Sequence, residues 1–125
     1  MKPTPYQEAL RYLQNAKETL QKAGKDGGLY KDKKYVKAAS GMAYSGVLLA
    51  LDAYLAQKEG NRYKKPKSIE DYQTRLAKQN KKLLALVNNA YGSLHIEGYY
   101  YGIPSVKNIQ SGFEDAYKIV EYIKD

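Results

Sequence analysis

The sequence contains no cysteine and no tryptophan, a single histidine, and no long uninterrupted apolar run. Without cysteine, the chain can form neither a disulfide nor a thiolate zinc site. The longest apolar stretch, residues 46–56, is interrupted by Asp52 and is much shorter than the ~20 residues of a membrane span. The first residues lack the apolar segment of a signal peptide. We therefore expect a cytoplasmic protein with no membrane contact.

Basic residues and tyrosines are what the chain has in excess. The formal net charge is +8, fourteen residues are tyrosine, and Phe113 is the single phenylalanine. A positive charge attracts nucleic acid or another polyanion, although it also keeps a small helical protein in solution. Tyrosine suits positions where the ring is buried and the hydroxyl stays wet, as in a thin helical bundle or a subunit interface.

Apolar residues recur at three- and four-residue spacing in four segments, and no strand-like alternation appears. Thr4, Pro5 and Gln7 form a capping-box pattern that predicts the start of the first helix. Ser68 and Asp71 predict the start of the third helix in the same way. The predicted helices, within one domain of residues 1–125, cover residues 5–23, 33–59, 68–91 and 105–124. The short connections indicate an all-α, antiparallel up-and-down four-helix bundle.

The second predicted helix is rich in small residues. Gly41 and Gly46 each cost about 1 kcal/mol in a helix interior relative to alanine. Close approach of a neighbouring helix usually offsets such a cost, so we expect this helix at the centre of the bundle. Small residues and abundant tyrosines together also favour an exposed self-complementary face, and hence a homodimer.

The sole histidine, His95, lies in the stretch GSLHIEGYYYG, residues 92–102, just before three consecutive tyrosines. The glycines of this stretch and Pro104 after it indicate a corner between two helices. His95 is a weak catalytic candidate, because imidazole is the commonest general acid or base, and a structural role is the alternative. No phosphate-binding glycine loop, nucleophile elbow or second histidine accompanies it. We therefore predict no cofactor and no metal site.

A second cluster of functional candidates is basic and lies between and along the second and third predicted helices. These polyanion-binding candidates are Arg62, Lys64, Lys65, Lys67, Arg75, Lys78, Lys81 and Lys82. Contacts with phosphates need only such charges on one accessible face, so the cluster predicts binding of RNA or another polyanion. The tyrosines of residues 99–101 can stack on unpaired bases. They follow the opposite end of the third predicted helix, so the sequence does not join the two clusters into one site.

Several stretches together carry a resemblance to a known group of proteins. They are RYLQNAKETLQKA, YVKAASGMAYSGVLLALDAYL, AYGSLHIEGYYYG and SVKNIQSGFEDAYKIVEYI. They resemble HEPN-type helical bundles, which are common in prokaryotes, and within that group a small uncharacterised family of bacterial four-helix proteins. The resemblance spans nearly the whole chain and rests on helical pattern and small-residue placement. It implies a HEPN-like arrangement of helices, as in the substrate-binding subunits of nucleotidyltransferases.

Catalytic members of the HEPN group are ribonucleases that carry an arginine shortly before a histidine. His95 stands where that histidine would, but Asn88, Asn89 or Ala90 occupies the arginine position. Asparagine can form hydrogen bonds but has no guanidinium to stabilise a developing phosphorane charge. The resemblance therefore implies a non-catalytic role, as a homodimer or as the partner of a minimal nucleotidyltransferase.

The leading hypothesis is a non-enzymatic interaction module that serves as companion subunit to a nucleotide- or nucleic-acid-handling partner. Its expected ligand or partner corner consists of Asn88, Asn89, His95, Tyr99, Tyr100 and Tyr101. One alternative is a divergent RNA-binding protein or ribonuclease that uses His95. The other alternative is a structural protein with no ligand of its own.

Overall fold

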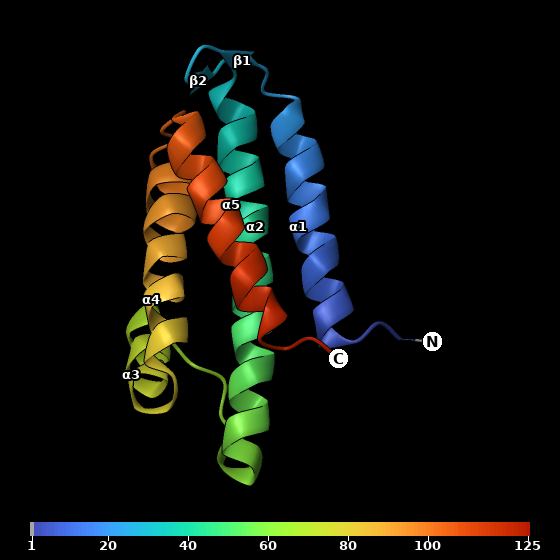
Figure 1. The fold of residues 1–125 in the computed structure, drawn as a ribbon, viewed down its shortest axis with the longest axis vertical. Helices are drawn as coiled ribbons and strands as arrows, with labels where there is room; N and C mark the ends of the chain where they lie inside the picture. Colours follow the sequence, from blue (N-terminus) through green and yellow to red (C-terminus); the bar gives the residue numbers. More distant parts are fainter. Residues whose placement is uncertain (1) are drawn as a thin grey trace.

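The computed structural model describes residues 2–125 as a bundle of helices closed at one end by a small β-hairpin (Figure 1). The elements are α1 (Pro5–Gln21), β1 (Lys25–Asp26), β2 (Leu29–Tyr30), α2 (Lys33–Glu59), the short 3-10 helix η1 (Gly60–Arg62), α3 (Ile69–Gln79), α4 (Lys81–Ala90), the π-helical segment η2 (Tyr91–Tyr100) and α5 (Val106–Glu121). Figure 1 shows α2 running nearly the full height of the molecule, with α1 on one side, α4 on the other and α5 crossing in front of it. The predicted all-α class is confirmed, but the described residues form five α-helices rather than four.

Capping residues set the helix starts as the sequence predicts. Gln7 N donates to Thr4 Oγ1 at 3.1 Å, and Thr4 N donates to Gln7 Oε1 at 3.1 Å, which completes the capping box of α1. Ser68 Oγ accepts from Asp71 N at 3.2 Å at the start of α3. The predicted bounds of α2 are confirmed, and its cap is Asp32, whose carboxylate accepts from Lys34 N.

The third predicted helix, residues 68–91, is divided into two helices at Asn80. This residue has an extended backbone (φ −161°, ψ 94°) that ends α3 and begins α4. Its Oδ1 accepts from Leu83 N at 3.0 Å, and its Nδ2 donates to Tyr54 Oη on α2 at 3.2 Å. The apolar periodicity continues across the division and conceals it. The preference of asparagine for helix caps is the only local signal of the break.

We expect Asn80→Ala to lower the free energy of unfolding by about 1–2 kcal/mol, because it removes both the α4 cap and the bond to Tyr54. Urea denaturation measures the loss. Lys78→Ala is the matched control, since Lys78 is exposed on α3 and such surface changes usually stay within about 0.5 kcal/mol. Equal stabilities of the two variants would contradict this role for Asn80.

Two connections differ from the sequence-based prediction. The expected turn before α2 contains a hairpin in which Lys25 pairs with Tyr30 and Asp26 with Leu29. The expected corner of residues 92–102 is helical as far as Tyr100, and the chain reverses only at Gly102, where φ is +64°. Of the glycines in this stretch, Gly98 allows close packing and Gly102 allows the turn. Segments of π-helix are rare and frequently occur at functional sites.

The central position of α2 is confirmed, and its glycines are the points of closest approach. A Cβ at Gly46 would lie 3.1 Å from Tyr12 Cβ and 3.3 Å from Ala9 O, so the α1 backbone lies directly on this position. A Cβ at Gly41 would lie 2.9 Å from Cδ1 of Tyr99. The cost of each glycine in the helix is thus matched by a close contact, with α1 at one position and with η2 at the other.

The apolar character of α2 follows from its burial in the bundle. Among the described residues, the helical stretch Lys33–Arg62 is the one segment long and apolar enough to cross a membrane by length and composition, and 56% of its most apolar window is buried. Asp52, the acid within that apolar stretch, accepts a 2.5 Å hydrogen bond from Tyr72 Oη of α3. This bond satisfies the carboxylate and fastens α3 to the central helix.

Candidate functional site

The segment η2 stacks aromatic rings along the side of the bundle. Tyr91, His95 and Tyr99 lie four residues apart, which places their side chains one above another on the helix surface. The Tyr91 and His95 ring centroids are 5.3 Å apart with planes at 27°, and those of His95 and Tyr99 are 5.8 Å apart at 16°. Tyr44 of α2 lies against His95 at 4.8 Å. We call Tyr44, Tyr91, His95 and Tyr99 the aromatic column.

The column stands close to α2 because small residues face each other across the contact. Gly98 is buried against Ser40, and a Cβ at position 98 would overlap Ser40 Oγ and lie 2.6 Å from Ser40 Cβ. At the next residue of each segment, the Tyr99 ring covers Gly41. Within residues 2–125, the buried Ser40 Oγ has no hydrogen-bond partner. Close packing of η2 onto α2 is therefore obtained at the cost of an unsatisfied hydroxyl.

His95 is enclosed by packing rather than by the partners of a catalytic base. Its ring contacts three tyrosines, one of which, Tyr44, is only 8% exposed. A catalytic histidine is normally oriented by an acid or set beside a nucleophile. The ion pairs formed within residues 2–125 do not include His95, and no group of acidic and histidine side chains there could hold a metal ion. The geometry thus gives His95 a packing role in the column.

The two asparagines at the expected arginine position lie on α4 and are exposed. Asn88 Oδ1 accepts a hydrogen bond from Gln73 Nε2 of α3 at 2.8 Å. Asn88 thereby joins α3 to α4 across the break at Asn80. The structure assigns Asn89 no comparable contact.

Beyond the column, Tyr100 and Tyr101 extend into solvent. Their side chains are 65% and 57% exposed, compared with 48% for Tyr99. The Tyr100 and Tyr101 rings meet edge to face with centroids 4.9 Å apart. Exposed aromatic rings of this size are costly to leave in water without a purpose.

Backbone hydrogen bonds hold these tyrosines in place. Tyr101 N donates to Ile96 O at 3.0 Å, and Ile103 N donates to Glu97 O at 2.8 Å. The Glu97 carboxylate also accepts from Asn108 Nδ2 of α5 at 3.2 Å. The end of η2 is therefore tied to the start of α5, and the exposed rings project from a fixed backbone.

Two lysines of α2 lie against Gly102, the residue that directly follows the exposed tyrosines. A Cβ at the buried Gly102 would lie 2.5 Å from Lys33 Cε and 3.0 Å from Lys37 Cγ, so the aliphatic stems of both lysines cover this glycine. Their side chains are otherwise exposed. We call Lys33, Lys37, Tyr99, Tyr100 and Tyr101 the tyrosine corner. The tyrosines were candidates from the sequence, but their proximity to these lysines depends on how η2 packs on α2.

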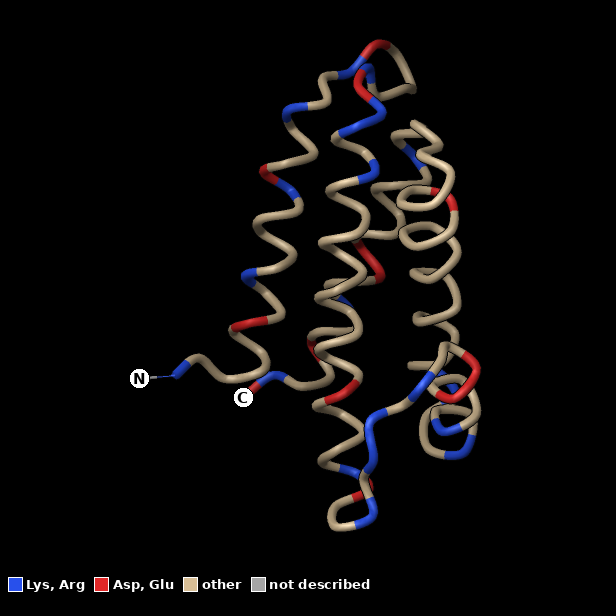
Figure 2. Tube along the Cα trace, turned by 180° about the vertical axis from the view of Figure 1, so that it is seen from behind, with Lys and Arg blue, Asp and Glu red and all other residues tan. Residues whose placement is uncertain are grey.

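The predicted basic cluster lies at the other end of the bundle, along the connection from α2 to α3 and on the helices after it (Figure 2). Arg75 is neutralised there: its guanidinium contacts Asp71 at 3.1 Å and Glu59 at 3.2 Å, and donates to Lys64 O at 2.6 Å. Arg75 therefore fastens the connection to α2. The exposed members are Arg62, Lys64, Lys65, Lys67, Lys78, Lys81 and Lys82. The basic cluster is not part of the tyrosine corner, and Asn88 and Asn89 are not part of it either.

A family model described as a domain of unknown function, DUF5618, matches residues 4–125. The chain belongs to this family. A solved protein of unknown function from Dyadobacter fermentans is 39% identical to this DUF5618 protein and superposes on it with a TM-score of 0.83, covering 94% of this chain and 91% of that chain. No curated protein matches it. The uncharacterised family expected from the sequence is confirmed, and the HEPN resemblance of this DUF5618 protein stays a prediction.

Proposed function

We propose that the protein is a non-enzymatic, HEPN-like binding module that contacts single-stranded nucleic acid through its tyrosine corner. In this role it would serve as companion subunit to a nucleic-acid-handling partner such as a minimal nucleotidyltransferase. The observation that carries the proposal is that exposed Tyr100 and Tyr101 directly precede Gly102, which the stems of Lys33 and Lys37 cover.

The chemistry of the corner matches that of single-strand binding. Each base stacked on an aromatic side chain contributes about 1–3 kcal/mol, and every base offers a face for stacking. Lysine ammoniums beside the rings neutralise the phosphates that link the stacked bases. The backbone bonds of Tyr101 and Ile103 fix the backbone that carries the rings before binding, which lowers the ordering cost.

A binding role is supported more than a ribonuclease role. The ring of His95 is packed among tyrosines, and the guanidinium of Arg75 is held by two carboxylates. Neither group is placed as a general base or as a cationic clamp on a phosphate. Ribonuclease activity that is lost in His95→Ala would favour the catalytic alternative instead.

Fluorescence anisotropy with a labelled oligouridylate tests the proposal directly. Tyr100→Ala with Tyr101→Ala should weaken binding about tenfold or more, because two stacking platforms are removed. Lys33→Gln with Lys37→Gln should weaken binding. It should also reduce the slope of log affinity against log salt concentration by about 1.4, because each of two lost phosphate contacts contributes about 0.7 to that slope.

The matched control is Lys64→Gln with Lys65→Gln, which removes the same charge from the distal basic cluster. This control should change the affinity and the salt slope much less than the Lys33 and Lys37 pair. Equal effects of the two lysine pairs, or no binding at ~50 mM salt, would contradict the proposal.

A second candidate role for the same end of the molecule is contact with a second copy of the chain. Leu29 and Ile103, which are 54% and 40% exposed, add apolar surface close to the start of α5. Sedimentation velocity tests this: a dimer that Ile103→Asp dissociates would support the predicted homodimer. A monomer at every concentration would exclude it.

A further inference from the structure

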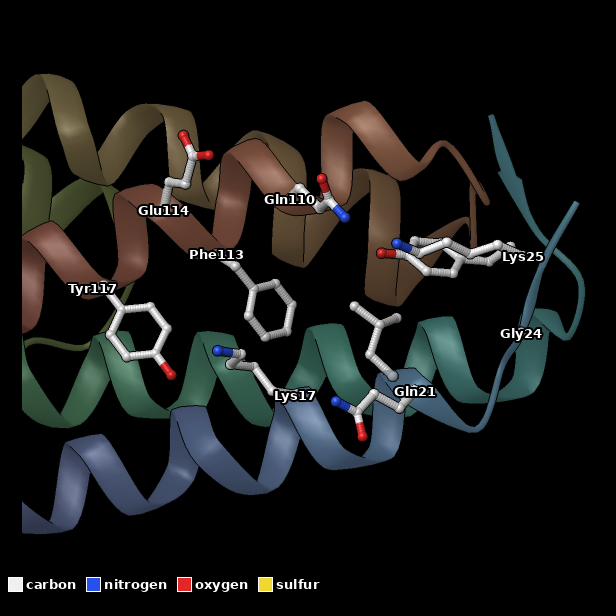
Figure 3. Close-up of a pocket in the computed structure, with 10 residues that line it drawn as sticks. Lys17, Gln21, Gly24, Lys25, Gln110, Phe113, Glu114 and Tyr117 are labelled. Atoms are coloured by element: carbon white, nitrogen blue, oxygen red, sulfur yellow. The ribbon is translucent and has the colours of Figure 1, made fainter. Parts of the chain in front are cut away.

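A groove of about 410 Å³ opens between α1 and α5 below the β-hairpin, and none of its lining residues belongs to the tyrosine corner (Figure 3). This volume lies within the ~300–1,000 Å³ that is usual for small-molecule sites. The groove exists because α1 packs on α2 along its length. A gap is left between α5 and the part of α1 that lies nearest the hairpin. Its residues come from α1, the hairpin and α5.

The floor of the groove is apolar and aromatic. Leu20, Tyr30 and Phe113 are 8%, 5% and 7% exposed, so they present fixed faces rather than mobile side chains. Tyr117 closes one end, and Figure 3 shows its hydroxyl directed toward α1. Rings in this arrangement accept a flat apolar molecule by stacking and edge contacts.

The rim of the groove is positively charged. Lys17 Nζ lies 5.7 Å from the centroid of the Tyr117 ring, and Lys25 Nζ lies 6.0 Å from that of Tyr30. The ion pairs formed within residues 2–125 include neither lysine. Glu114 is the acid of the lining, and Figure 3 shows its carboxylate on the other side of α5 from the Phe113 ring. The two ammonium groups are therefore free to meet an anion.

Neutral donors add to this positive rim. Burial raises the pKa of Tyr30, with a smaller opposing effect of a hydrogen bond with Gln110, and burial also raises the pKa of Tyr117. Both hydroxyls thus stay protonated at neutral pH and can donate to a bound oxygen. The contact of each lysine with a ring is weak at an exposed site, so a carboxylate readily replaces it.

We propose that this groove binds a small, flat organic acid, whose apolar ring system lies on Phe113 and whose carboxylate is held by Lys17 or Lys25. An aromatic carboxylate has both features: a ring for the aromatic floor and a negative charge for the cationic rim. The site is independent of nucleic-acid binding at the tyrosine corner.

Titration of the isotope-labelled protein with naphthoate, followed by NMR, tests the site. We expect saturable one-to-one binding, with the largest shifts in the amide signals of residues 17–25 and 110–117. Naphthylmethanol has the same ring system without the charge, and it should bind about tenfold more weakly because it lacks the charged hydrogen bonds. Shifts centred elsewhere, the absence of saturation, or equal affinity for the two compounds would overturn the proposal.

Variants separate the roles of charge and shape. Lys17→Gln with Lys25→Gln should weaken naphthoate binding about tenfold and leave naphthylmethanol binding unchanged. The control Lys22→Gln, at the exposed C-cap of α1, should alter neither. Gln110→Trp places a large ring in the groove and should abolish binding of both compounds. Thermal unfolding of each variant establishes that it is folded. Retained naphthoate affinity in the double lysine variant would overturn the assignment of the rim.

Discussion

Gly98→Ala is expected to destabilise the protein by about 3 kcal/mol, the upper end of the usual cost of overpacking a core. The added methyl group would overlap Ser40 Oγ, lie 2.6 Å from Ser40 Cβ and 3.0 Å from Ile109 Cδ1. Ser40 belongs to the central helix and Ile109 to α5, so η2 cannot move away from one without disturbing the other. Urea denaturation at neutral pH measures the loss.

The direction of this effect distinguishes packing from helix propensity. In an isolated helix, alanine is favoured over glycine by about 1 kcal/mol, which is the opposite sign. Gly92→Ala is the matched control, because it lies in the same segment and a Cβ there meets nothing within 4 Å. Gly92→Ala should be neutral or slightly stabilising. Similar stabilities of the two variants would show that η2 does not pack on α2 as described.

Ser40→Gly should partly rescue Gly98→Ala, since it removes both Ser40 atoms that the new methyl would meet. Alone, Ser40→Gly loses about 0.5 kcal/mol of helix propensity, which is offset in part because an unsatisfied buried hydroxyl disappears. A double-mutant cycle should give a favourable coupling of about 1–2 kcal/mol. Strict additivity of the two changes would contradict direct contact between these positions.

Alkaline pH is expected to destabilise the protein steeply through its buried tyrosines. Burial, a hydrogen bond to Asp52 and the charge of Asp52 raise the pKa of Tyr72 far above its ordinary value. Burial raises the pKa of Tyr44 strongly as well, with a smaller effect of Tyr91. Both side chains are less than a tenth exposed, at 5% and 8%. The folded protein therefore keeps these protons at pH values where the unfolded chain releases them.

The sign and size of this effect follow from proton linkage. The contribution of each raised tyrosine is fully present below the unfolded pKa of about 10, and it is lost as pH rises toward the folded value. Each group costs about 1.4 kcal/mol per pH unit in that window. Because the unfolded tyrosines are only half ionised at pH 10, Tyr44 and Tyr72 together should lower the free energy of unfolding by roughly 2 kcal/mol between pH 10 and pH 11, and by about 2.8 kcal/mol per pH unit above that. Urea denaturation at a series of pH values measures the slope.

Tyr72→Phe should reduce that slope by about 1.4 kcal/mol per pH unit, because phenylalanine has no hydroxyl proton for the folded protein to retain. At neutral pH it should also cost about 1–3 kcal/mol, since Asp52 loses its partner. Leu76→Ala, in the same helix and fully buried, is the control. It should lower stability by about 2–5 kcal/mol at every pH and leave the slope unchanged. An unaltered slope in Tyr72→Phe would contradict the linkage.

Much of the bundle could be predicted from local chemistry. The capping residues Thr4 and Ser68 gave correct helix starts because caps act within a single turn. Gly41 and Gly46 correctly predicted a central helix, because a glycine in a helix interior needs a close neighbour to offset its cost. The uncharacterised family was also predicted correctly from the overall pattern.

Other features depended on contacts between distant residues. The break at Asn80 interrupts the backbone but leaves the apolar face continuous, so periodicity alone could not locate it. The glycines of η2 suggested a flexible corner, whereas Gly98 is buried on Ser40 within a helical segment. The i, i+4 spacing of Tyr91, His95 and Tyr99 was a visible signal of the aromatic column, provided that the stretch was taken as helical.

The residues of the candidate site also differ from the sequence-based prediction, because they are brought together by contacts between distant residues. The basic candidates from the sequence lie within residues 62–82, whereas the lysines at the tyrosine corner, Lys33 and Lys37, come from α2. Arg75 counted as a free charge in the sequence, yet Asp71 and Glu59 neutralise it in the folded protein. Charge counts identify a basic protein, and only the packing of helices decides which charges share a surface.

The central claim is that nucleic acid binds at the tyrosine corner rather than along the distal basic cluster. An NMR titration of the labelled protein with an oligouridylate at low salt tests it most directly. We predict that the largest amide shifts fall in residues 33–37 and 99–102 and saturate together. Shifts concentrated in residues 62–82, or no saturable change at residues 99–102, would contradict the claim.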